Sequence, residues 1–313
     1  MLEVVAPGVL ATLQGAPRTG WRHMGMPYAG AADPVSLALA NRLVGNPAFA
    51  PAIEATYGGL RLKFYDKRAF AVVGADGVDK LDGAPIIRHQ TNMSSPGAVL
   101  EIVPPERGVR KYVAVAGGLA VEPFLGSPSL YQPAGVGGGF GRPLQPGDKL
   151  TLGAAQPDAA ILEIPLALRP ILAKQWVLRA APSRETEWLD KASRDRLFSE
   201  PWTVARRTDR MGARLDGPPL TVITKKIMKS APVFPGTVQC PDSGNPYLLG
   251  PDAQTTGGYP RIAQIALCDR HRFGQLRPGD TVFLTRVDIE IMRRALADKH
   301  AALATFVPDF QFI

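Results

Sequence analysis

Short stretches of alternating hydrophobic and polar residues, separated by turn-forming residues, run along most of this chain. Residues 144–152 and 276–284 each contain a Pro-Gly-Asp turn that opens onto such a stretch, and a third stretch begins at Trp176. Alternation with a period of two is typical of β-strands, because successive side chains point to opposite faces of a sheet. The 32 glycines and 30 prolines interrupt the chain too often for long helices to dominate. The pattern predicts a mainly β protein with a few helices, a β-rich α+β fold.

Two segments have the signals of helices instead. The segment 34–44 follows Asp33, a good N-cap residue, starts with a proline, and is followed by Gly45. The segment 288–303 places its apolar residues on one face and predicts a packing helix close to the C-terminus.

The same pattern predicts two β-rich domains. A proline-bounded segment, Pro165–Pro170, separates two alternating regions, so we expect domains at residues 1–168 and 169–313. The similarity of residues 144–152 to residues 276–284 suggests that the two domains arose by duplication.

The composition is typical of a globular protein that folds without disulfides, metals or a membrane. With 45% hydrophobic and 20% charged residues, 313 residues can bury one or two cores without disulfides or metals. Cys240 and Cys268 lie beside apolar strands, and no secretory segment follows Met1, which predicts reduced thiols and a cytoplasmic location. No stretch approaches transmembrane length, and the four histidines lack the spacing of metal ligands. We therefore expect no membrane association and no metal.

The net charge of +8 raises the possibility of a nucleic-acid partner. Basic residues are spread along the chain, and the densest group, Lys225, Lys226 and Lys229, has no interleaved aromatics to stack on bases. We expect no nucleic-acid partner. The same charge is suited to attracting ATP, carboxylated substrates or an acidic partner subunit.

The loop 252–260 has the composition of a ligand-binding segment. Its hydroxyl, amide and carboxylate groups can donate and accept hydrogen bonds, while two adjacent glycines let backbone N–H groups approach a ligand closely. The alternative is an Asx or Ser/Thr turn that leads into the strand 261–266. We predict a site for a planar, amide-like ligand, with the nominated binding residues Gln254, Thr255, Thr256, Gly257, Gly258 and Tyr259, and Asp252 as a candidate catalytic group.

Two further polar segments precede that loop. Residues 239–247 again combine amides, a carboxylate and a glycine. From this segment we nominate Gln239 as a substrate-binding residue and Asp242 as a catalytic residue. Residues 206–217 contain Arg210 and Arg214, whose guanidinium groups can clamp a carboxylate or phosphate. A solvated basic hairpin is the alternative for this third segment.

These segments, with the N-terminal part of the chain, resemble the family once called allophanate hydrolase subunit 2. The family is also described as biotin-dependent carboxyltransferase-like and includes the C subunit of bacterial ATP-dependent 5-oxoprolinase. The resemblance covers nearly the whole chain. The residues that match the family pattern are Gly30–Asp33, Ala40–Asn46, Glu54–Thr56, Gly59, Tyr112–Gly118, Leu125–Ser129, Gly138–Arg142, Asp209–Leu215 and Gln254–Pro260.

The resemblance implies β-barrel domains of cyclophilin-like type and a subunit of an ATP-dependent, multi-subunit enzyme that opens 5-oxoproline to glutamate. It implies a companion subunit of the allophanate hydrolase subunit 1 type, a small amide substrate, ATP within the complex and no covalently bound cofactor. One alternative is the carboxyltransferase component of a urea or guanidine carboxylase, with carboxybiotin supplied by another chain. A second is a non-catalytic antagonist of a sensor-kinase inhibitor.

Either enzyme must stabilise charge that develops on oxygen, a role for Arg210 or Arg214 with the backbone N–H groups of Gly257 and Gly258. Carboxyl transfer also needs a base, for which Glu54, Asp242 and Asp252 are candidates. Each nominee has a structural alternative. Glu54 can be a buried partner of an arginine, and Asn41, nominated for binding, can tie a helix to a neighbouring loop. His23 is the histidine best placed for proton transfer, or an incidental residue of an exposed loop.

The chain departs from the family pattern at two positions. Gly15 follows Gln14 where the family usually has an aspartate, and Ala231-Pro232 follows Ser230 where the family has an acidic residue and a glycine. Either change points to a different substrate or to a relative that has lost catalysis.

Overall fold

The computed structural model describes residues 1–154, 160–224 and 228–313, so Lys225 and Lys226 of the predicted basic group lie outside the described residues. It divides into two compact units. Unit 1 comprises residues 1–19, 29–172 and 300–311, and unit 2 comprises residues 20–28, 173–299 and 312–313.

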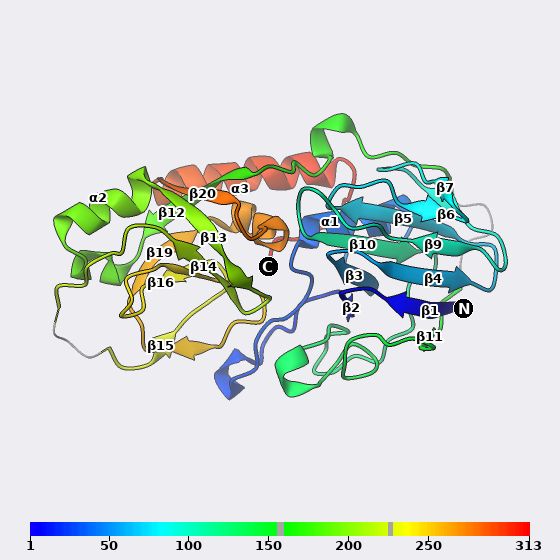
Figure 1. Cartoon of the computed structure of the whole chain (residues 1–313), viewed down its shortest axis with the longest axis horizontal. Helices are drawn as coiled ribbons and strands as arrows, with labels where there is room; N and C mark the ends of the chain where they lie inside the picture. The colour runs from blue at the N-terminus through cyan, green and yellow to red at the C-terminus, as the bar shows by residue number, and fades with distance from the viewer. Residues whose placement is uncertain (155–159, 225–227) are drawn as a thin grey trace. The chain divides into compact units, whose positions relative to one another are not determined.

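Unit 1 contains two antiparallel sheets (Figure 1). The first has the order β11-β1-β4-β9-β6-β7, and the second has the order β2-β3-β10-β5-β8. The strands of the first sheet are β1 (Leu2–Pro7), β4 (Leu60–Phe64), β6 (Lys80–Leu81), β7 (Ala84–Pro85), β9 (Val99–Glu101) and β11 (Lys149–Leu150). Those of the second are β2 (Leu10–Gln14), β3 (Ala52–Thr56), β5 (Ala69–Gly74), β8 (Asn92–Met93) and β10 (Arg110–Val115).

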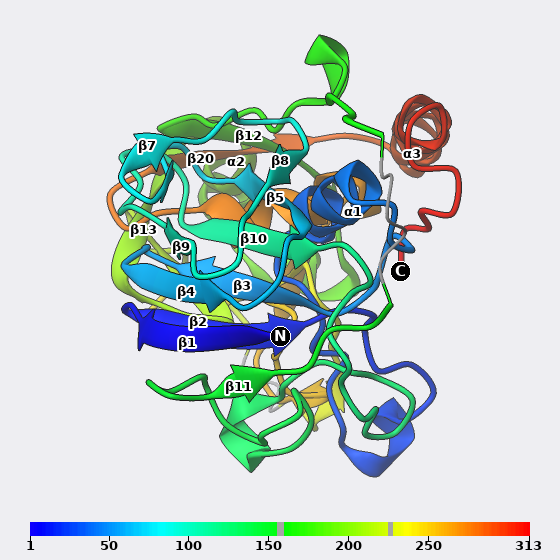
Figure 2. The ribbon, with the colours of Figure 1, turned by 90° about the vertical axis from the view of Figure 1, so that its right-hand side faces the viewer.

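The core of unit 1 receives one face of each sheet. Leu62 and Phe64 of β4 pack there with Leu13 of β2 and Ile53 of β3. The opposite face of the second sheet is buried as well, because helix α1 (Pro34–Leu43) packs against β5 and β10 (Figure 2). Residues on this second face therefore lose contact with water, and any polar group among them needs a partner inside the protein.

Unit 2 is built on a closed barrel of seven strands in the order β12-β19-β16-β17-β14-β13-β20. Neighbouring strands are antiparallel except for β12 and β20, which run parallel. The barrel strands are β12 (Gln175–Pro182), β13 (Pro201–Thr208), β14 (Gly212–Asp216), β16 (Thr237–Gln239), β17 (Tyr247–Leu249), β19 (Arg261–Ile265) and β20 (Thr281–Arg286). A separate two-stranded ribbon joins β15 (Ala231–Pro232) to β18 (Thr256–Gly257).

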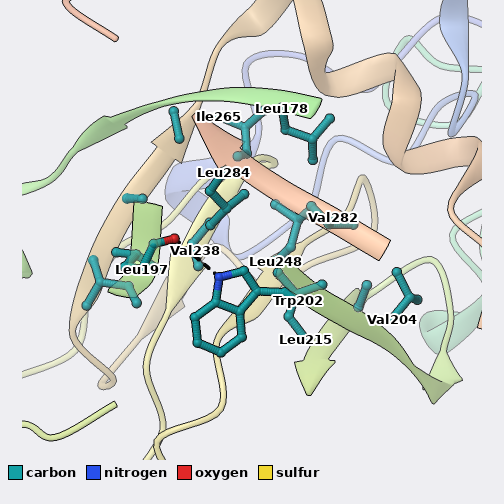
Figure 3. Packing of buried hydrophobic residues seen from close by; sticks show 14 of the residues in the cluster. Leu178, Leu197, Trp202, Val204, Leu215, Val238, Leu248, Ile265, Val282 and Leu284 are labelled. Atoms are coloured by element: carbon teal, nitrogen blue, oxygen red, sulfur yellow. Dashed lines mark hydrogen bonds between the residues drawn. The ribbon is translucent and has the colours of Figure 1, made fainter. Parts of the chain in front are cut away.

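The inward-facing residues of these strands fill the barrel (Figure 3). Trp202 is fully buried, and its indole N–H donates a hydrogen bond of 3.2 Å to the Leu197 carbonyl in helix α2 (Lys191–Ser199). A buried indole needs such an acceptor, since its N–H has lost water. The remaining helices are α3 (Ile289–Ala304) and the short 3-10 segments η1 (Arg22–Met24), η2 (Gln132–Ala134), η3 (Leu166–Leu168), η4 (Arg184–Trp188) and η5 (Leu267–Gln275).

The mainly β class and the barrel are confirmed. Helix α1 begins and ends within one residue of the predicted segment, and the Asp33 carboxylate accepts a hydrogen bond from the Ser36 N–H as an N-cap does. Cys240 and Cys268 are both buried free thiols. No helix among the described residues is long and apolar enough to cross a membrane.

Candidate functional site

The predicted ligand loop is held in unit 2 by the side chain of Gln239. This residue is buried at the end of β16, and its Nε2 donates 3.2 Å to the Tyr259 carbonyl while its Oε1 accepts 3.3 Å from Gln254 Nε2. Gly257 lies directly against it, because a Cβ placed on Gly257 would come within 2.6 Å of Gln239 Nε2. The structure therefore brings together four of the nominated binding residues, Gln239, Gln254, Gly257 and Tyr259.

An arginine that the sequence did not nominate lies at the same loop. The guanidinium of Arg22, on η1, donates from Nη2 to the carbonyls of Val233 and Thr255, the latter at 3.4 Å. It also stacks between two aromatic rings, 4.8 Å from the centroid of Tyr28 and 4.8 Å from that of Phe234. Burial lowers the pKa of Arg22, although the group stays cationic at neutral pH.

A second arginine, Arg270 on η5, lies in the same part of unit 2. A Cβ placed on Gly236 would come within 3.1 Å of Arg270 Nε. Burial lowers the pKa of Arg270. Within the described part of the chain, neither arginine has a carboxylate within 4 Å, and Arg22 Nη1 and Arg270 Nε are buried without hydrogen-bond partners.

The nominated residues Arg210 and Asp252 are paired with each other. Arg210 Nε donates 2.8 Å to Asp252 Oδ2, and Arg210 Nη2 donates 2.8 Å to Asp252 Oδ1. Their side chains are only 7% and 2% exposed. Such a buried bidentate pair fixes the loop that carries Asp252 to the end of the preceding hairpin, and this geometry supports a structural role.

Other nominees lie at the surface of unit 2. Arg214 forms a partly exposed ion pair of 2.8 Å with Asp216 on the same strand. Asp242 is exposed in the turn after Cys240, and His23 is exposed on η1 beside Arg22. Thr256 and Gly258 of the ligand loop are exposed as well.

In unit 1, Glu54 belongs to a buried hydrogen-bond network on the second face of the second sheet. Its Oε2 accepts from the Ala32 N–H at 3.0 Å and from the Tyr112 hydroxyl at 2.7 Å, and Arg110 Nε lies 3.3 Å from its Oε1. The Tyr112 oxygen accepts in turn from the Asp33 N–H at 2.8 Å. Burial, together with the neighbouring Glu54 charge, raises the pKa of Tyr112 well above its usual value, so the phenol keeps its proton.

Asn41 also connects parts of unit 1. Its amide N–H₂ donates 3.1 Å to the Ala48 carbonyl and 2.9 Å to the Ala50 carbonyl, and its oxygen accepts 3.2 Å from Asn46. The side chain joins the end of α1 to the following loop and is fully buried. This arrangement supports the structural alternative for Asn41.

The first departure from the family pattern occupies a tightly packed position, and the second lies on a short strand at the surface of unit 2. A Cβ on Gly15 would come within 2.8 Å of Pro128 Cγ, so this loop has no room for a larger residue as it stands. Ala231 and Pro232 form strand β15, which pairs with Gly257 and Thr256 of the ligand loop. The second departure therefore lies next to the candidate site.

Sequence reasoning missed Arg22, Tyr28, Phe234 and Arg270. The one available signal was the position of Arg22 next to His23, the candidate for proton transfer. No group of three or more His, Cys, Asp or Glu residues suited to a metal ion occurs among the described residues.

Comparison with known proteins places this architecture in a family. A sequence profile described as carboxyltransferase domain, subdomain A and B, matches residues 24–286. The chain is 36% identical over 301 residues to the C subunit of 5-oxoprolinase from Escherichia coli K12, covering 96% of this chain and 95% of that protein. It is 28% identical to the urea amidolyase of Saccharomyces cerevisiae, covering 96% of this chain and 17% of that protein.

A solved structure has the same fold. The crystal structure of the K. lactis urea amidolyase superposes with a TM-score of 0.91 at 27% identity, covering 97% of this chain. The chain spans 20% of the length of that protein. This chain belongs to the family of carboxyltransferase domains built from subdomains A and B, which confirms the resemblance drawn from the sequence.

Proposed function

We propose that this chain acts as the C-type subunit of an ATP-dependent enzyme that opens 5-oxoproline to glutamate. The observation that carries the proposal is the 36% identity to the C subunit of Escherichia coli 5-oxoprolinase, which extends over 95% of that protein. A second such protein, the C subunit of 5-oxoprolinase from Haemophilus influenzae, is 34% identical over 93% of this chain.

The ligand loop is chemically suited to this substrate. A five-membered lactam presents a planar amide, which matches the donors and acceptors of Gln239 and Gln254. Phosphorylation of the lactam oxygen by ATP would make the carbonyl carbon open to attack by water. During that step, backbone N–H groups and guanidinium groups near the loop would stabilise charge on oxygen. We propose that ATP acts within the assembled enzyme.

Carboxyl transfer to urea or a guanidino compound is the second candidate. It is favoured by the TM-score of 0.91 to the K. lactis urea amidolyase and by the family profile. In that reaction carboxybiotin would be delivered by another chain. The lower identity of 28% to the yeast urea amidolyase makes it the weaker of the two proposals.

The proposed reaction requires other chains. We propose a hetero-oligomer with a companion subunit of the allophanate hydrolase subunit 1 type. The two free buried thiols support a reducing compartment such as the cytoplasm.

The test is to purify the tagged chain from its host with its partners and to supply 5-oxoproline with ATP. Formation of glutamate, absent when either this chain or ATP is omitted, is the expected result. Bicarbonate- and urea-dependent ATP hydrolysis by a complex that contains a biotin carrier, without glutamate formation, would instead establish the second candidate.

A further inference from the structure

Two arginines in unit 2 carry positive charge that no neighbouring carboxylate of the described residues balances. Elsewhere in the same unit, buried or half-buried arginines are paired with acids: Arg210 with Asp252, and Arg179 with Asp269. Arg22 and Arg270 differ from these two, because no described carboxylate lies within 4 Å of either. Both residues are half-buried, and each has one guanidinium nitrogen that is fully buried. Removing such a donor from water without a partner is unfavourable, so a fold that tolerates two of them suggests a ligand that supplies the missing charge.

The donors that lack partners are specific atoms. Arg22 uses Nη2 for the Val233 and Thr255 carbonyls and keeps Nη1 buried and unpartnered among the described residues. The rings of Tyr28 and Phe234 hold its guanidinium plane in place. A guanidinium fixed in this way binds an oxyanion with little loss of side-chain entropy.

Arg270 is placed in the same neighbourhood. Its buried Nε has no hydrogen-bond partner in the described residues. Gly236, whose added Cβ would lie 3.1 Å from Arg270 Nε, is two residues from Phe234, whose ring stacks on the Arg22 guanidinium. The Thr255 carbonyl that Arg22 contacts belongs to the ligand loop itself.

We propose that Arg22 and Arg270 form an oxyanion-binding site that takes the carboxylate of the substrate. This inference rests on the proposed function for the identity of the ligand, 5-oxoproline. The carboxylate would accept hydrogen bonds from Arg22 and Arg270, while the lactam end lies toward the loop held by Gln239. The site distinguishes 5-oxoproline from a neutral amide such as urea or 2-pyrrolidone.

The test uses the assembled enzyme and two variants, Arg270→Gln and Arg22→Lys. Arg270→Gln removes a charge without removing a side-chain hydrogen bond to any described residue. Arg22→Lys keeps the charge but loses the planar, two-pronged geometry of the guanidinium. Arg286→Gln, which removes an exposed arginine of β20, is the matched control. Tryptophan fluorescence verifies that each variant is folded, because Trp21, Trp176, Trp188 and Trp202 all lie in unit 2.

Equilibrium binding of labelled 5-oxoproline in the absence of ATP is measured together with the KM for glutamate formation. We expect each site variant to weaken binding and raise KM at least tenfold, with a smaller change in kcat, and the control to stay within twofold of wild type. Wild-type enzyme should bind 2-pyrrolidone at least tenfold more weakly than 5-oxoproline, because that lactam lacks the carboxylate.

Three outcomes separate this inference from the proposed function. Glutamate formation with unchanged KM in both folded site variants would overturn the inference and retain the function. Arg270-dependent binding of acetate, without glutamate formation by wild type, would retain the carboxylate site and refute the function. Arg270-dependent binding of inorganic phosphate that 5-oxoproline does not displace would overturn the carboxylate assignment in favour of a phosphate.

Discussion

The substitution Glu54→Gln separates the two roles that the sequence left open for this residue. Glutamine keeps the shape of the side chain and can still offer one oxygen to the Ala32 N–H and the Tyr112 hydroxyl. Its N–H₂ group would then face Arg110, whose side chain is only 6% exposed. Removing one member of a buried ion pair costs about 3–5 kcal/mol, because the remaining charge loses the interaction that offset its removal from water.

The assay must report on the stability of unit 1, and the positions of the tryptophans allow the two units to be followed separately. Unit 1 contains no tryptophan, so tryptophan fluorescence follows unit 2, whereas hydrogen exchange of peptides from β3 and β10 follows unit 1. A loss of about 3–5 kcal/mol corresponds to roughly two to three and a half orders of magnitude faster exchange when exchange requires unfolding of the unit. Glu101→Gln, the same change at an exposed position of β9, should alter stability by less than about 0.5 kcal/mol.

A double variant tests whether the loss of stability comes from the ion pair between Glu54 and Arg110. Arg110→Met in the Glu54→Gln background removes the charge that Glu54 balanced, so the two changes together should destabilise unit 1 by less than the sum of their separate effects. If Glu54→Gln instead left exchange in β3 and β10 unchanged and abolished glutamate formation, the structural argument would be refuted. Glu54 would then be retained as a candidate catalytic base.

Three further predictions concern other residues of the two units. Asp252→Asn should destabilise unit 2 by about 3–5 kcal/mol in urea unfolding followed by tryptophan fluorescence, since Arg210 loses its ion pair with Asp252. Asp242→Asn, in an exposed turn, should leave stability unchanged. Gly257→Ala should displace Gln239 and raise KM for 5-oxoproline, whereas Gly258→Ala, whose added Cβ would lie 3.6 Å from its nearest neighbour, should not. Burial, with the charges of Arg88 and Arg169, lowers the pKa of His89 to about 4. Between about pH 4 and 6.5 the unfolded chain therefore binds one more proton at this residue than the folded chain does. The stability of the wild-type protein should fall as pH decreases through that range. His89→Asn, which tolerates the left-handed backbone there, should reduce this pH dependence by about 1–2 kcal/mol in unfolding at pH 4.5 and 7; an unchanged slope would contradict the assignment.

The features that the sequence predicted well are those specified by neighbouring residues. Helix α1 is an example, because its N-cap contact joins Asp33 to Ser36, three residues along the chain. The Pro-Gly-Asp turn before β20 is another local signal. The same turn before β11 opens onto a strand of only two residues, so a similar sequence produces a much shorter element in unit 1.

The features that the sequence did not predict depend on distant residues. The partner of Arg210 is Asp252, 42 positions away, and the carbonyls contacted by Arg22 belong to residues more than 200 positions away. Composition identified Asp252 and Arg210 as functional candidates because a charge in a polar loop looks the same whether or not it is paired. Only the fold distinguishes a carboxylate that neutralises an arginine from one that is available to a substrate.

This distinction bears on the choice between the two proposed substrates. The Glu54–Arg110 and Arg210–Asp252 pairs are internally balanced, so their charges stabilise the fold and offer little to a ligand. Arg22, which contacts the Thr255 carbonyl of the ligand loop, and Arg270 have no described carboxylate within 4 Å, and a neutral substrate such as urea would leave their charge uncompensated. A carboxylate would neutralise it, and 5-oxoproline carries its carboxylate on the carbon next to the lactam nitrogen. The carboxylate site proposed at Arg22 and Arg270 thus agrees with lactam opening, and it rests on the same assignment of the substrate.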